Sequence, residues 1–242
     1  ALVSSTPSAS AAPVVYQLTE VLDAGNAANA GKGRVTYEYE IGIYEWTNSQ
    51  YTSFLNAVDP AGTNLRSLYN ANMGTSLSGG ISFNAGAAAG SKYAVRTNMG
   101  SKPVNFVSWF DAARVANWMG NGQGSGDTET GSYTLVANQI SGVAPGRNNG
   151  DFYYIPTENE WYKSAYYKAG GTSAGYWTYA TMSNSIPTAT TADATGSGNA
   201  GLPNAANYGL EANWNGTSGG NVTTVGSNGG TSAYGTYDQS GN

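Results

Sequence analysis

Residues 103–119 read PVNFVSWFDAARVANWM, a stretch that contains both the start and the buried face of a helix. Ser108 is followed three residues later by Asp111, the spacing of a capping box in which each side chain accepts a hydrogen bond from the other residue's backbone N–H. The apolar positions that follow have helical spacing and are Ala112, Val115, Ala116 and Met119. We therefore predict a helix that begins after Ser108 and ends at Gly120.

The segment YEWTNSQYTSFLNAV, residues 44–58, opens in the same way. Thr47 and Gln50 have the spacing of a second capping box. The apolar face that follows consists of Tyr51, Phe54, Leu55 and Val58. Asp59 and Pro60 end this predicted helix, because proline cannot continue it.

A third segment, IPTENEWYKSAYY at residues 155–167, carries a capping box at Thr157 and Glu160. The side chains expected to face inward are Trp161, Ala165 and Tyr166. The glycine pair Gly170–Gly171 is the predicted end of this helix.

The charged residues of these segments have structural interpretations. Glu158 and Glu160 are two residues apart, so they diverge on a helix and cannot form a catalytic carboxylate pair. Asp111 lies in a first turn, where it suits the helix dipole, and Arg114 is its expected partner. The lysines expected to be solvated are Lys163 and Lys168.

Outside the helices the sequence predicts short strands and long loops. Residues 35–43 alternate between apolar and polar side chains, as in a half-buried strand, and Val15 with Leu18 indicates an earlier strand. The long irregular stretches are 61–102, 121–151 and 170–207. No fixed-period repeat or change in composition divides the chain. We predict one loop-rich α+β domain with about three short helices.

Composition limits the classes of function. Only 10% of the 242 residues are charged, the net charge is −5, and the basic residues are scattered, so we expect no nucleic-acid partner. No apolar run is long enough for a membrane span. The small, uncharged start at residues 1–13 resembles a processed arm, and the low lysine content is typical of secreted bacterial surface proteins. We therefore expect an extracellular or cell-surface location.

The chain contains no cysteine and no histidine. This composition leaves no thiolate nucleophile, imidazole base or ordinary zinc ligand within these residues. Metals bound by oxygen, such as calcium, remain compatible with the sequence.

The three helix-start segments and the closing segment YGTYDQSGN, residues 234–242, occur in the order of four sequence blocks of the formylglycine-generating enzyme family, the sulfatase-modifying-factor domains. The resemblance covers residues 14–242. It implies a variant of the C-type lectin fold with little regular structure. Several branches of that family use the scaffold for binding or display.

The enzymes of that family bind copper through paired cysteines in a segment that follows the last block, beyond Asn242. The resemblance therefore implies no copper site in the residues at hand. We expect a secreted, non-catalytic scaffold that acts in binding or self-assembly at the cell surface or in the extracellular matrix, with itself or another extracellular protein as partner. Two alternatives stay open: a formylglycine-generating oxidase whose cysteine segment lies beyond Asn242, and a carbohydrate-binding module. A further expectation is that the family's final strands are missing, and that the arm of residues 1–13 of a neighbouring copy covers the open sheet edge.

The resemblance also implies two calcium positions. Asp238 and Gly241 match one family calcium site, and Asn207 and Tyr208 match the start of another. Calcium takes six to eight oxygen ligands with several carboxylates, and the segment after Tyr208 is poor in acids. Turn formation by these Asn, Asp and Gly residues is the alternative interpretation.

Aromatic residues are abundant, with 18 tyrosines and 6 tryptophans. The helical ones are expected in the core and are Trp109, Trp118, Trp161, Tyr166 and Tyr167. The loop aromatics are candidates for stacking on a glycan or for a subunit contact, and are Trp177, Tyr179, Trp214, Tyr234 and Tyr237. Packing beneath the loops is the alternative for this second set.

Overall fold

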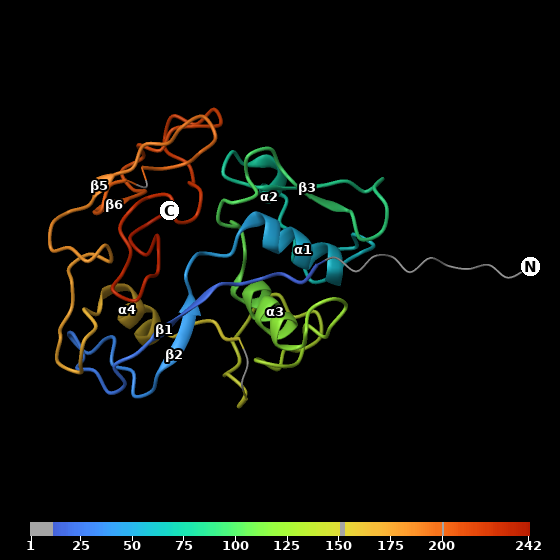
Figure 1. The fold of residues 1–242 in the computed structure, drawn as a ribbon. Coiled ribbons are helices and arrows are strands. Elements are labelled where there is room, and N and C mark those ends of the chain that lie inside the picture. Colours follow the sequence, from blue (N-terminus) through green and yellow to red (C-terminus); the bar gives the residue numbers. More distant parts are fainter. Residues whose placement is uncertain (1–11, 151–152, 200) are drawn as a thin grey trace, which may run out of the picture.

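The computed structural model describes residues 12–150, 153–199 and 201–242. These residues contain the four helices α1 Asn48–Val58, α2 Asn72–Thr75, α3 Trp109–Gly120 and α4 Glu158–Tyr166. The strands are β1 Leu18–Val21, β2 Tyr39–Gly42, β3 Ile81–Phe83, β4 Tyr93–Val95, β5 Thr188–Ala189 and β6 Ala205–Ala206. Figure 1 shows long irregular loops between them, in agreement with the predicted loop-rich α+β class. The single turn α2 was not predicted, because one turn carries no periodic pattern.

The predicted arm of residues 1–13 lies almost wholly outside the described residues. None of the described helices has the length and apolar character needed to cross a lipid bilayer.

All three predicted capping boxes are present. Thr47, Ser108 and Thr157 each accept a hydrogen bond from the backbone N–H three residues on, and the residue at that position bonds back. The predicted boundaries of α1 and α3 are confirmed, since α1 ends at the Asp59 cap and Gly120 is the last residue of α3.

Helix α4 ends at Tyr166, earlier than the predicted stop at Gly170–Gly171. Tyr167 leaves the helix with extended backbone angles, φ −69° and ψ 140°, and its side chain is fully buried. The segment that follows the helix then turns back to its end, where Trp177 N donates to Tyr166 O at 2.8 Å. The predicted inward position of Trp161 is wrong, since its side chain is 37% exposed.

The strands form three separate two-stranded sheets. The pairs β1–β2 and β3–β4 are antiparallel, and β5–β6 is parallel. Strand β2 is shorter than the predicted 35–43. Val35 is buried but pairs with a loop, because its N–H donates to Asn26 Oδ1 at 3.1 Å and its carbonyl accepts from Gly25 N at 2.8 Å.

The main core lies where α1 and α3 pack against the β3–β4 hairpin. Phe54 and Trp118 meet there in an edge-to-face contact, with 5.3 Å between the ring centroids. Other buried members are Tyr51, Leu55, Leu68, Met73, Ile81, Tyr93, Val115 and Met119. The opposite face of α3 packs on the loop that follows it, through Phe110, Tyr133 and Leu135. Helix α3 is therefore covered on two sides.

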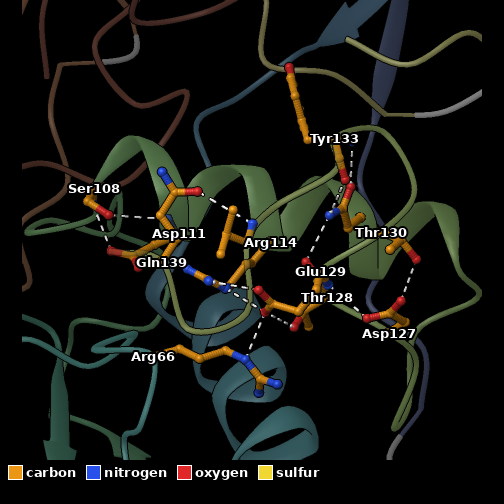
Figure 2. A network of polar contacts seen from close by, with 12 residues as sticks. Arg66, Ser108, Asp111, Arg114, Asp127, Thr128, Glu129, Thr130, Tyr133 and Gln139 are labelled. Atoms are coloured by element: carbon orange, nitrogen blue, oxygen red, sulfur yellow. Dashed lines mark hydrogen bonds and ion pairs between the residues drawn. The ribbon is translucent and has the colours of Figure 1, made fainter. Parts of the chain in front are cut away.

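The partner of Arg114 is Glu129 rather than the predicted Asp111. Arg114 is fully buried, and its Nε and Nη2 donate to the two Glu129 carboxylate oxygens at 2.8 and 2.9 Å. Figure 2 shows Glu129 between Arg114 and Arg66, whose Nε lies 2.8 Å from Oε1. The Asp111 carboxylate instead accepts a hydrogen bond from the backbone N–H of Ser108 at 2.8 Å. A bidentate carboxylate fixes the loop after α3 more firmly than a helix-surface pair could.

Glu160 joins α4 to two other segments. Its carboxylate accepts from Arg147 Nη1 and Nη2 at 2.8 and 2.6 Å, from Thr157 N at 2.6 Å and from Tyr37 Oη at 2.7 Å. Burial raises the pKa of Glu160, but the hydrogen bonds led by Arg147 outweigh burial and lower its pKa to about 2.

Lys163, one turn further along α4, is fully buried, so the prediction of a solvated lysine is wrong. Its ammonium donates to Asp23 O at 3.0 Å and lies 5.9 Å from the centroid of the Tyr39 ring. Burial lowers the pKa of Lys163. Lys168, in contrast, is only half-buried and lies over the Trp177 ring at 4.6 Å.

We predict that Glu160→Gln lowers the free energy of unfolding at neutral pH by about 2 kcal/mol, because Arg147 loses its charged partner. The folded-state pKa is depressed, so the carboxylate stabilises the fold above its ordinary value of 4.5, and this stabilisation is lost as the pH falls towards about 2. Urea unfolding at a series of pH values measures both effects. Glu158→Gln is the matched control, since that side chain is 64% exposed, and we expect little change. A loss equal to that of Glu160→Gln in the control would contradict the prediction.

Candidate functional site

The closing segment returns to the first strands of the chain. Tyr237 N donates to Ile43 O at 2.9 Å, next to the end of β2, and Thr19 Oγ1 on β1 donates to Tyr234 O at 2.7 Å. The rings of Tyr44 and Tyr237 stack with 5.1 Å between centroids. Two sequence blocks from opposite ends of the chain therefore form one site.

A pair of carboxyl groups lies at this junction. Glu45 interacts with the Asp238 carboxyl and with the Asn242 side chain. Glu45 Oε2 is buried and accepts no hydrogen bond from a donor in the described residues. Burial and then the Asp238 charge raise the pKa of Glu45 to about 8. When Glu45 is protonated, its carboxyl group can donate a hydrogen bond, which two adjacent carboxylates cannot do.

Asp238 is held by the loop opposite. Gly226 N donates to Asp238 Oδ2 at 2.6 Å and Asn228 Nδ2 donates to Oδ1 at 2.8 Å. The Asp238 backbone is left-handed, with φ 57°, a conformation that Asp tolerates in turns. Burial raises the pKa of Asp238. Both carboxylate oxygens thus serve to close a loop.

Asparagine side chains complete the cluster. Asn242 Oδ1 accepts from Thr223 N and Thr223 Oγ1 at 2.6 and 2.7 Å, and Asn242 Nδ2 donates to Thr223 O at 3.2 Å. Asn207 Nδ2 donates to Asn221 O at 2.7 Å, while Gly241 O accepts from Asn207 N at 3.4 Å. The structure therefore brings Asn207 next to Gly241 and Asn242, although the resemblance assigned Asn207 and Asp238 to two separate calcium positions.

Few of the predicted calcium ligands carry a negative charge. The carbonyl oxygens of the neighbouring residues Asn221 and Thr223 accept hydrogen bonds from the side-chain amides of Asn207 and Asn242. Across residues 12–150, 153–199 and 201–242, no group of three or more acidic, histidine or cysteine side chains lies close enough together to hold a metal ion. Calcium prefers several carboxylates, and here Asp238 is the one carboxylate among the predicted ligands.

A cavity of about 430 Å³ lies beside the cluster. Its walls come from four distant parts of the chain and include Asn105, Phe106, Asn207, Tyr208, Leu210 and Asn221. Tyr208, predicted as a calcium neighbour, is 40% exposed, and its hydroxyl donates to Pro187 O.

The loop aromatics predicted as binding residues have mixed environments. Trp214 is buried, and its indole N–H donates to Val222 O at 2.8 Å. Tyr234 is buried, with its hydroxyl 3.0 Å from Asp23 Oδ2. Tyr237 is half-buried against Tyr44, and Trp177 and Tyr179 are half-buried. Trp214 and Tyr234 therefore have a packing role, which does not suit them to stacking on a glycan.

Two charged residues of this region, Glu45 and Lys102, carry no local sequence signal. Glu45 is 193 positions from Asp238 (238 minus 45), so no local spacing links them. Lys102 is 3% exposed, and its ammonium donates to Thr195 O at 2.9 Å and to Thr224 Oγ1 at 2.6 Å. The Lys102 ammonium also lies 4.9 Å from the Trp214 ring centroid, so it joins the loops that carry Thr195, Trp214 and Thr224.

We predict that the Glu45–Asp238 pair makes stability depend on pH. The folded-state pKa of Glu45 is raised, so its stabilisation is complete below the ordinary value of 4.5 and is lost as the pH rises through about 8. The free energy of unfolding should fall by at most about 1.4 kcal/mol per pH unit in this window. Urea unfolding of Glu45→Gln should lack this slope, and Glu40→Gln, on the exposed side of β2, should keep it. An identical slope in wild type and Glu45→Gln would contradict the assignment.

We predict no calcium dependence of thermal stability, because Asp238 is the one carboxylate among the predicted ligands and its two oxygens already accept hydrogen bonds from Gly226 N and Asn228 Nδ2. Differential scanning fluorimetry in calcium, in magnesium and in EDTA should give the same Tm. A calcium-specific rise in Tm that Asp238→Asn abolishes would show that the site binds the ion.

Comparison with known proteins identifies the family of the chain. A family model described as the sulfatase-modifying factor enzyme 1-like domain matches residues 15–242. No curated protein and no solved structure matches the chain. The matched region includes the three capped helices and the closing segment, so the resemblance inferred from these blocks is confirmed. The chain belongs to the family of the sulfatase-modifying factor enzyme 1-like domain.

Proposed function

We propose that this domain is a secreted, non-catalytic scaffold with a C-type-lectin-like fold that acts by binding and self-assembly at the cell surface or in the extracellular matrix. The observation that carries the proposal is an apolar surface loop at residues 136–143. Val136, Ile140 and Val143 are 72%, 50% and 90% exposed within this short stretch. Three exposed aliphatic side chains within eight residues favour a protein interaction surface in this loop.

The loop is ordered by its own hydrogen bonds. Gln139 N donates to Val136 O at 2.9 Å and Gln139 Nε2 donates to Ser141 O at 3.1 Å. Val136 and Ile140 are therefore held outward with little loss of conformational entropy on association. The low charge of the chain also favours self-association, because copies with a net charge of −5 over 242 residues repel one another weakly.

The ionisable side chains have structural uses that support a scaffold. Glu129, Glu160 and Asp238 each accept two or more hydrogen bonds that close loops. Lys102 and Lys163 donate to backbone carbonyls. Oxidation by a cysteine segment beyond Asn242 stays a prediction.

We predict concentration-dependent self-association of the wild-type chain, measured by sedimentation velocity. The triple variant Val136→Lys, Ile140→Lys and Val143→Lys should be a monomer, because burying charged side chains in the contact is unfavourable. Ile186→Lys is the matched control, since this side chain is 70% exposed at another place on the surface. A wild-type monomer at every concentration would contradict self-assembly, and association that survives the triple substitution would exclude this loop as the contact.

A further inference from the structure

The cavity beside the closing segment is lined without charge. Its lining contains no Asp, Glu, Lys or Arg side chain, although Glu45 interacts with Asn242, which is part of that lining. Its volume of about 430 Å³ falls within the range of small-molecule sites. A charged ligand would find no oppositely charged side chain in this lining. The cavity therefore suits a neutral ligand.

Two amide oxygens in the walls are available as acceptors. Asn105 Nδ2 donates to Ser78 O at 3.0 Å and Asn207 Nδ2 donates to Asn221 O at 2.7 Å, so the backbone fixes both amides. Within the described part of the chain, neither Asn105 Oδ1 nor Asn207 Oδ1 accepts a hydrogen bond. A purely apolar ligand would cover these oxygens and leave them unpaired, which is unfavourable. The ligand should therefore carry hydroxyl or N–H donors.

Apolar side chains form another part of the wall. Phe106 is 37% exposed, Tyr208 40% and Leu210 67%. Phe106 and Leu210 have left-handed backbones, with φ 63° and 65°, a costly conformation for bulky residues. The hydrogen bond from the Tyr208 hydroxyl to Pro187 O fixes the second aromatic ring. An exposed aromatic surface next to fixed acceptors suits a ring that has one apolar face and many hydroxyls.

We propose that this cavity binds a neutral saccharide, with a pyranose ring against Phe106 or Tyr208 and hydroxyl groups donating to Asn105 and Asn207. The proposal deepens the binding role proposed above and rests on it. It uses none of the residues of the self-association loop, so sedimentation of the triple lysine variant and saccharide binding can fail independently.

Saturation-transfer NMR on the wild-type chain tests the proposal with three neutral disaccharides, cellobiose, lactose and N,N′-diacetylchitobiose, and with anionic sialyllactose. We expect transfer to the ring protons of at least one neutral disaccharide and no preference for the anionic sugar. No transfer to any neutral disaccharide overturns the proposal. Binding of tetra-alanine in place of the sugars also overturns it, because the ligand would then be a peptide.

Two variants locate the binding. Gly219 lines the cavity, and a Cβ added there meets nothing within 4 Å, so Gly219→Phe adds a bulky ring at the cavity wall without a steric clash at Cβ. Gly146→Phe is the matched control, because Gly146 has equally open space on a distant loop. We expect Gly219→Phe to weaken binding by at least about tenfold and the control to leave it unchanged.

Phe106→Ala removes the aromatic wall and should weaken binding even if Gly219→Phe disturbs folding, which far-UV circular dichroism reports. Saccharide binding that is unchanged in both Gly219→Phe and Phe106→Ala would exclude this cavity as the site.

Discussion

A chain with so little regular structure must satisfy its buried backbone groups by other means, and asparagine side chains do this throughout the fold. Asn26 accepts from Val35 N and donates to Gly33 O, and Asn56 accepts from Tyr93 N and donates to Tyr93 O. Asn117 bonds Tyr133 in the same two-sided way. Each amide takes the place of a neighbouring strand, because it offers a donor and an acceptor together. The positions of the long loops depend on these contacts.

Buried charges extend the same principle over longer distances. Arg114 ties α3 to the loop at Glu129, and Lys163 ties α4 to the carbonyl of Asp23. A buried charge is costly unless several partners surround it, so each one strongly favours a single loop arrangement. Few charges are then needed, and the remaining surface is neutral and polar. The exposed apolar loop at residues 136–143 lies on such a surface, where charge repulsion between copies is weak.

The helices were predictable because their signals are local. A capping box and the apolar stripe behind it lie within a dozen residues, so Thr47, Ser108 and Thr157 marked three helix starts correctly. The ion pairs were not predictable, because Glu129 lies beyond the end of α3 and nothing in the spacing of Arg114 indicates it. The same holds for the candidate site, where Glu45 and Asp238 meet only after the chain has closed on itself. The order of the family blocks drew attention to Asp238 and Asn207, but only the structure shows that Asp238 bonds to Gly226 and Asn228 and that Asn207 bonds to Asn221.

The amides that hold the loops also determine what the cavity can bind. Asn105 and Asn207 each use the nitrogen to hold a wall and leave the oxygen free of hydrogen bonds from the described residues. The acceptors are therefore fixed before a ligand arrives, which reduces the entropy lost on binding. Because the amides are held in place and no flexible charged side chain lines the cavity, the cavity favours ligands whose donors match the positions of these two oxygens. Stability and recognition thus depend on the same side chains, so a substitution that frees Asn207 should loosen the Asn221 loop and the cavity together.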